Sequence, residues 1–191
     1  MFTVPLGRSP HAAERRSVGR QNRVQSESFP IIAEIGATLA GFAAIAGVIR
    51  SEPIDRDAAF DIAAYGAMAT LFALGAILLT TELGEIVGLR FLATALFVVS
   101  GASAARNIAL ARRVQSERKA ANAEPEPPVA VVFGVSAIPL ILLTPLLSVC
   151  VALNIGGSSA ALLYAFALLS SLGVAFLLLL YLLAKHFVHR R

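Results

Sequence analysis

Charged residues are scarce in this sequence, at 15% of 191 residues, while 57% are apolar. Soluble domains carry about 25% charged residues. The charges cluster in residues 1–28, 50–61, 106–126 and 185–191, which leaves stretches of about 20 residues almost free of charge. A water-soluble chain of this length has too little polar surface to cover so many apolar stretches. The pattern excludes an ordinary soluble domain and indicates helices surrounded by lipid.

Cysteine and histidine are also scarce, and tryptophan is absent. The single cysteine, Cys150, excludes a disulfide within the chain and a cysteine-based zinc site, and we interpret it as a small buried apolar residue. The three histidines lie near the chain ends, which excludes histidine as a general base inside the apolar stretches. His186 and His189 are spaced to share a metal on a helix. No third ligand lies near them, so we predict neither a metal site nor a cofactor.

Five apolar stretches are present, and they predict an all-α bundle of about five membrane-spanning helices. Each stretch has the roughly 20 residues that a helix needs to cross a hydrocarbon core about 30 Å thick. Short polar, glycine-containing or proline-containing runs separate the stretches, which supports an arrangement of helical hairpins. The predicted spans are residues 29–49, 58–79, 86–105, 129–153 and 160–183.

Both ends of the chain are polar and basic. Residues 1–28 contain five arginines and no apolar span, so we predict a disordered basic tail. This tail is either a translocated segment, a targeting peptide, or a stretch upstream of a later true start, for example at Val24. A twin-arginine export signal at Arg15 and Arg16 is a further alternative. Residues 185–191 form a second basic tail.

The third span has no helix breaker directly after it. Residues 106–123 consist mostly of good helix formers, so we predict a basic helical extension that leaves the membrane and ends before Pro125. Its apolar and basic residues suit contact with anionic lipid headgroups, and no nucleic-acid partner is predicted, because the basic residues flank apolar spans. The basic residues assigned to this contact are Arg112, Arg113, Arg118 and Lys119.

The distribution of Lys and Arg predicts the orientation in the membrane. Five spans place residues 50–57, residues 106–128 and the C-terminus on one side, with ten basic residues among them, and the five arginines of the N-terminal tail on the other. Because basic residues concentrate in cytoplasmic loops, we predict a bacterial inner membrane protein with a cytoplasmic C-terminus. The arginines of the tail conflict with this orientation unless the mature chain lacks them.

Two charged residues, Glu34 and Arg90, fall inside the predicted spans. Glu34 is four residues past Pro30, and Arg90 is five residues past Glu85. Both are therefore expected at a similar depth, roughly 6 Å inside the same end of the bundle. A lone charge there costs roughly 1–3 kcal/mol, which favours an ion pair. The pair is either structural or part of a proton, ion or polar-substrate path, and separate snorkelling of the two side chains to the interface is the third interpretation.

Three further features of the spans are candidates for a structural or binding role. Glu34, Ala37, Gly41 and Ala44 share one helix face, and such stripes are typical of close contact between membrane helices. Pro139 and Pro145 predict a kink or local unwinding of the fourth span. Carbonyls freed there, with Thr144 and Ser148, form a candidate polar site for a cation or for hydrogen bonds. Asp61 is expected to complement the dipole at the start of the second span.

These features predict a non-enzymatic membrane component or interaction subunit, whose partners are the lipid bilayer and a second copy or another membrane protein. The small-residue faces and the absence of motifs such as a P-loop or HExxH favour this function. A small transporter or channel subunit that uses Glu34 and Arg90 is the alternative. A membrane enzyme acting on lipid is a third hypothesis, for which the sequence offers no adequate set of residues.

Overall fold

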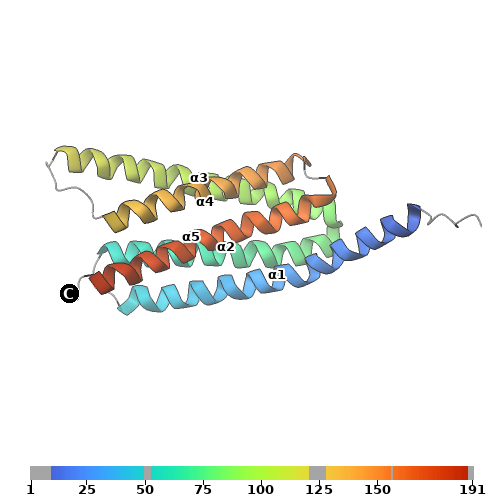
Figure 1. The fold of residues 1–191 in the computed structure, drawn as a ribbon, viewed down its shortest axis with the longest axis horizontal. Coiled ribbons are helices and arrows are strands. Elements are labelled where there is room, and N and C mark those ends of the chain that lie inside the picture. Colours follow the sequence, from blue (N-terminus) through green and yellow to red (C-terminus); the bar gives the residue numbers. More distant parts are fainter. Residues whose placement is uncertain (1–9, 50–52, 121–127, 156, 189–191) are drawn as a thin grey trace, which may run out of the picture.

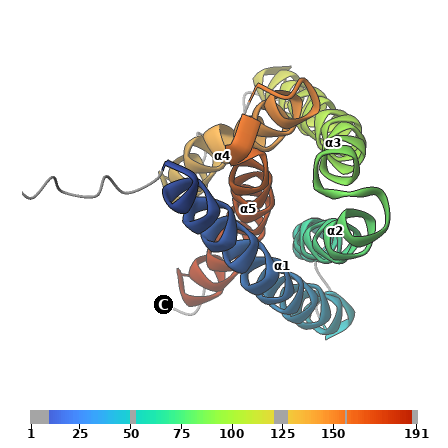
Figure 2. The same ribbon diagram turned by 90° about the vertical axis from the view of Figure 1, so that its right-hand side faces the viewer.

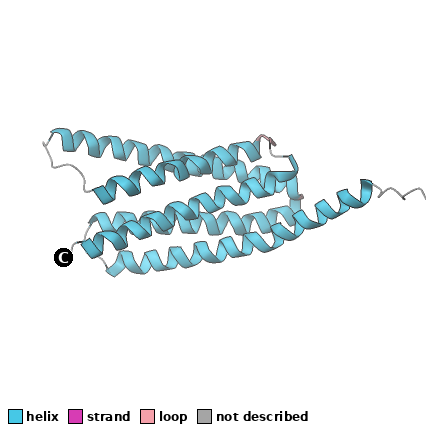
Figure 3. Ribbon diagram, viewed as in Figure 1, coloured by secondary structure: helices cyan, strands magenta, loops and turns pink. Residues whose placement is uncertain are grey.

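The computed structural model of this protein describes residues 10–49, 53–120, 128–155 and 157–188. These residues form five long helices and no strand (Figures 1 and 3). All five are long and apolar enough to cross a membrane, which confirms the all-α membrane-spanning fold. The helices are α1 (Pro10–Ile49), α2 (Pro53–Leu83), α3 (Glu85–Ala120), α4 (Pro128–Ala152) and α5 (Ala160–Val188), with a short 3-10 turn η1 (Gly157–Ser159) before α5.

Helix α1 begins far upstream of its apolar span. Residues 10–28 are helical, so the disorder predicted for them is wrong, while residues 1–9 lie outside the described residues. Pro10 occupies the first helical position. A backbone N–H there has no acceptor within the helix, so proline, which lacks this N–H, costs no hydrogen bond. The alanines, glutamate and arginines that follow are good helix formers and extend a helix that the apolar span already nucleates. Pro30 does not end the helix, which continues through it.

The later helices include the predicted spans, and two of them extend beyond their predicted ends. Helix α2 begins at Pro53 and ends at Leu83, whereas its predicted span was 58–79, and α5 continues to Val188. Helix α3 continues to Ala120, as its helix-forming sequence predicted. Helix α4 is continuous from Pro128 to Ala152 although Pro139 and Pro145 lie inside it. The predicted local unwinding is therefore wrong. Proline is tolerated in membrane helices because neighbouring groups satisfy the carbonyls that it leaves free.

Helix α5 occupies the centre of the bundle (Figure 2). It contacts each of the other four helices, whereas among the described residues α1 contacts only α2 and α5. Helix α3 packs between α2 and α4. The end of α1, the start of α2, the end of α3 and the end of α5 lie at one end of the bundle, and the α2–α3 turn and the start of α5 lie at the other (Figure 1).

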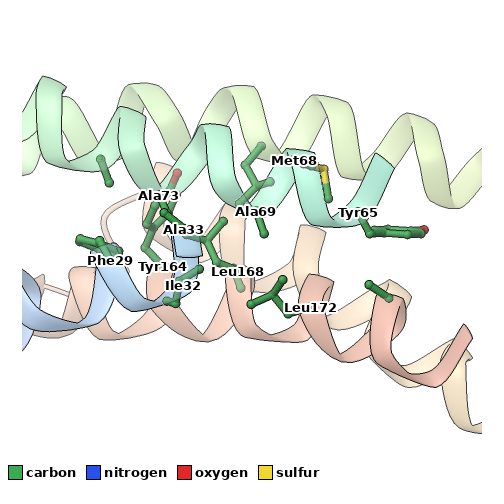
Figure 4. Packing of buried hydrophobic residues seen from close by; sticks show 14 of the residues in the cluster. Phe29, Ile32, Ala33, Tyr65, Met68, Ala69, Ala73, Tyr164, Leu168 and Leu172 are labelled. Carbon is green, nitrogen blue, oxygen red and sulfur yellow. The ribbon is translucent and has the colours of Figure 1, made fainter. Parts of the chain in front are cut away.

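The interior is built largely from alanine and a few larger side chains. Ala69, Ala73 and Ala167 are fully buried, so the helix backbones approach closely. Tyr164 fills the space between α1, α2 and α5 (Figure 4). Its hydroxyl donates to the Phe72 carbonyl over 3.1 Å, and its ring meets that of Phe29 edge-on at 5.9 Å. A buried tyrosine needs such an acceptor, and this one ties α5 to α2.

Helices α1 and α2 touch through their backbones. A Cβ atom at Gly36 would lie 2.7 Å from the Gly66 carbonyl oxygen and 2.6 Å from the Thr70 hydroxyl oxygen. A Cβ at Gly66 would lie 2.7 Å from the Gly36 carbonyl oxygen. The Thr70 hydroxyl donates across the interface to the Ala33 carbonyl over 3.1 Å. Small residues permit this approach, and dispersion contacts and the hydrogen bond hold it in a lipid environment.

Replacing Gly36 by alanine is expected to lower the free energy of unfolding in detergent by about 1–3 kcal/mol, because the added methyl group must push two backbones apart. Gly41→Ala on the same helix is the matched control, since a Cβ there meets nothing within 4 Å. Unfolding by a denaturing detergent, followed by circular dichroism, measures both variants. Equal stability of the two variants would contradict the close contact.

Candidate functional site

Glu34 lies near the middle of the membrane-spanning bundle. It is next to Ala33, whose carbonyl accepts a hydrogen bond from the Thr70 hydroxyl of α2. Gly36, two residues further along α1, also packs against Thr70. Thr70 stands midway along the apolar span of α2, which runs from Ala58 to Leu83. Glu34 is therefore roughly 18–20 Å from either end of that span at about 1.5 Å per residue. The sequence had placed it near one end.

Arg90 lies closer to the end of the bundle. Gly88 packs against the backbone of Leu79, and Leu92 packs against Gly75, so Arg90 is level with about residue 77 of α2. This position is about 10 Å nearer the end than Glu34. The Arg90 Nε–H donates to the carbonyl of Ala152, the last residue of α4, over 3.1 Å. A cation at a helix C-terminus is favoured by the helix dipole as well as by the hydrogen bond.

The C-terminus of α4 is closed by its own chain and by Arg90. Asn154 adopts a left-handed conformation with φ of 58°. The amide of Ile155 donates to the Cys150 carbonyl over 2.9 Å, and the Asn154 amide donates to the Val151 carbonyl over 3.0 Å. This is the bonding pattern of a Schellman cap. The cap leaves the Ala152 carbonyl without a partner from α4, and Arg90 supplies the missing donor.

The predicted ion pair between Glu34 and Arg90 is wrong for this structure. Helix α1 does not contact α3 in the described residues, and the two side chains differ in depth by about 10 Å. The error came from treating Pro30 as the start of a span, whereas the helix continues through it. Arg90 is satisfied instead by a backbone carbonyl on a helix far away in the sequence.

The Glu34 side chain is exposed in a groove between α1 and α5. Within the described part of the chain its carboxylate has no hydrogen bond and no ion pair, while its backbone carbonyl accepts from Thr38 over 2.8 Å. A charged side chain at the membrane centre costs about 2.5–3.5 kcal/mol on insertion scales, and such residues are usually functional. The groove has a volume of about 580 Å³ and is lined by Glu34, Ile35, Thr38, Leu39, Leu169, Leu172, Gly173 and Phe176.

Thr144 and Ser148 belong to a buried polar cluster between α4 and α5. The Thr144 hydroxyl lies 2.7 Å from that of Ser170 and 3.4 Å from that of Ser171. Ser148 donates to the Thr144 carbonyl over 2.8 Å. No buried side-chain polar atom in the described residues lacks a partner, so this cluster acts as hydrogen-bonding glue between helices. The sequence analysis missed Ser170 and Ser171, although a serine pair inside an apolar span was a visible signal.

A second polar group gathers where α2 and α3 reach the opposite end of the bundle. Asp61 and Arg106 approach to 3.8 Å, and the Asn107 amide donates to the Tyr65 hydroxyl over 3.1 Å. Together with Ser103 they line a small cavity of about 120 Å³. Helix α2 begins at Pro53, so Asp61 is its ninth residue. The predicted role of Asp61 at the dipole of the first turn is therefore wrong, and Asp61 pairs across helices instead.

The basic extension of α3 begins at this same end. Arg112 and Arg113 are exposed, and Arg113 pairs with Glu117 at 2.9 Å. Arg118 and Lys119 lie in the helix, but their side chains fall outside the described residues. Among the described residues, no group of three or more His, Cys, Asp or Glu side chains is arranged to hold a metal ion.

The geometry predicts that Glu34 and Arg90 act independently. Arg90→Met is expected to cost about 1 kcal/mol of stability and to speed amide exchange in residues 150–155, because the Ala152 carbonyl loses its donor. Glu34→Gln is expected to leave that exchange unchanged. The coupling in the double-mutant cycle is expected to lie within about 0.5 kcal/mol of zero. A coupling energy well above that value, measured by unfolding in detergent, would contradict this independence and support an ion pair.

The chain was also compared with known proteins. No protein-family model, curated protein or solved structure matches it. The functional proposals therefore rest on the chain's own residues and contacts.

Proposed function

We propose that this protein is a non-enzymatic membrane component that binds another transmembrane helix through the outer face of α1. The observation that carries this proposal is the stripe Ala37, Gly41 and Ala44, whose residues are exposed. A Cβ at Gly41 would meet nothing within 4 Å. Small residues that face away from the bundle leave room for a second backbone at close range.

The other small residues of α1 pack inside the bundle, and this contrast supports the proposal. Gly36 and Ala40 pack on α2, and Ala43 is also buried. Helix α1 thus has two small-residue faces, one occupied within the bundle and one open. The polar side chains buried in the described interior bond to one another or to helix carbonyls, which favours a structural role for them over a catalytic one.

The basic residues support an orientation with the C-terminus in the cytoplasm of a bacterial cell. The loop before α2, the extension of α3 and the end of α5 share one end of the bundle (Figure 1), and ten basic residues belong to these segments. Such a concentration favours the cytoplasmic side of the inner membrane. The exposed Arg112 and Arg113 suit contact with anionic headgroups there.

Crosslinking in native membranes tests the partner-binding face. In a Cys150→Ala background, Ala37→Cys is expected to give a discrete product with a membrane-permeant bis-maleimide, because a partner helix lies against the stripe. Leu71→Cys, an exposed position on α2, is the control at a similar depth and is expected to give little product. Equal products from both positions would indicate random collision and would contradict the proposal.

Transport is the second candidate function, and the mid-depth carboxylate of Glu34 favours it. Intramembrane acidic residues mark proton and ion pathways in many transporters. On this hypothesis Glu34→Gln abolishes proton or monovalent-cation flux in proteoliposomes while the protein stays folded and inserted. Glu82→Gln, at an exposed acid near the end of α2, is the matched control that keeps flux. Unchanged flux in Glu34→Gln would exclude this candidate.

A further inference from the structure

We propose that the groove between α1 and α5 is a binding site for amphiphilic organic cations, whose charge pairs with the Glu34 carboxylate. This site goes beyond the partner-binding role and does not depend on it. Glu34 shares a helix face with the stripe, but the groove also includes Ile35, Thr38 and Leu39 of α1 and is completed by α5. Three properties of the groove carry the proposal, namely its charge, its apolar walls and its continuation along the bundle.

The charge comes from one carboxylate without a counterion. Glu34 has no ion-pair partner in the described residues, and Arg90, the basic residue of the predicted span 86–105, bonds to Ala152 on another face of the bundle. The Glu34 carboxylate is level with Thr70, midway along the apolar span of α2, and is about 10 Å from the Glu27 end of the apolar span of α1. The ligand that relieves it best is a cation that is itself soluble in hydrocarbon, which a small hydrated metal ion is not.

The walls of the groove match the body of such a cation. Leu39 comes from α1, and Leu169, Leu172 and Phe176 come from α5. Phe176 is half exposed, so its ring face is available to a quaternary ammonium or phosphonium group. The volume of about 580 Å³ falls in the range of roughly 300–1,000 Å³ that holds drug-sized ligands.

The groove continues along α1 and α5 toward the end of the bundle that carries Arg90. A second apolar hollow of about 240 Å³ adjoins it through the shared residue Leu169, and Ile31 and Phe166 also line this hollow. An alkyl or aryl group attached to the cation fits along this path. The arrangement therefore selects a ligand with a charged centre and an extended apolar part.

Glu34 is the acidic side chain of the groove. No other titratable side chain lines the groove. On α5, Tyr164 donates to Phe72 and Tyr181 packs against Phe133; on α2, the residues facing this part of α1 are Gly66 and Thr70. Among the described residues that line the groove, the Glu34 carboxylate is therefore the group that can pair with a cation.

Tetraphenylphosphonium is the probe, and tetraphenylborate, an anion of the same shape, is its control. Calorimetry on the purified full chain in a non-ionic detergent is expected to show saturable binding of the cation and none of the anion. Glu34→Gln is expected to weaken cation binding by about tenfold or more, and Glu34→Asp to retain part of it. Glu82→Gln is expected to bind like the wild type.

Three results would overturn the site. The first is no saturable binding by wild-type protein whose helicity and monodispersity are intact. The second is equal binding of cation and anion, which would mean partition into apolar surface. The third is unchanged cation binding in folded Glu34→Gln. Failure of crosslinking at Ala37→Cys would count against the partner-binding function and would leave this site untouched.

Discussion

The close approach of α1 and α2 at Gly36 and Gly66 determines where everything on α1 lies. With carbonyl oxygens 2.7 Å from the positions that Cβ atoms would take, the two helices have one register, and the bond from Thr70 to Ala33 holds it. Lipid offers no hydrophobic driving force between helices, so such close contacts and hydrogen bonds must supply the association energy. Once this register is set, Glu34 lies close to the level of Thr70, exposed in the groove between α1 and α5.

A second constraint acts throughout the bundle, because polar groups in hydrocarbon must find partners inside the protein. Arg90 meets it by bonding to the free carbonyl at the end of α4. Thr144, Ser170 and Ser171 meet it by bonding to one another. The carboxylate of Glu34 differs from these groups, because it has no hydrogen-bond or ion-pair partner among the described residues. A group that the fold leaves unsatisfied is a natural place to look for a ligand.

Hydropathy and helix propensity were sufficient to predict the number of helices, their order and the extension of α3. These are local properties of about 20 consecutive residues. The depth of Glu34 was not predictable in this way, because Pro30 resembled a helix boundary and the register between α1 and α2 depends on glycines on both helices. The partner of Arg90 was not predictable from the sequence either. It is a backbone carbonyl 62 residues away, and sequence patterns do not show backbone acceptors.

The central place of α5 has a consequence for assembly. This helix is synthesised after the other four, yet it supplies the contacts that join α1 to the half of the bundle containing α4. Until it inserts, the carbonyl of Phe72 lacks its tyrosine donor and the Thr144 hydroxyl lacks its serine partners. The bundle therefore closes late, after an open four-helix intermediate.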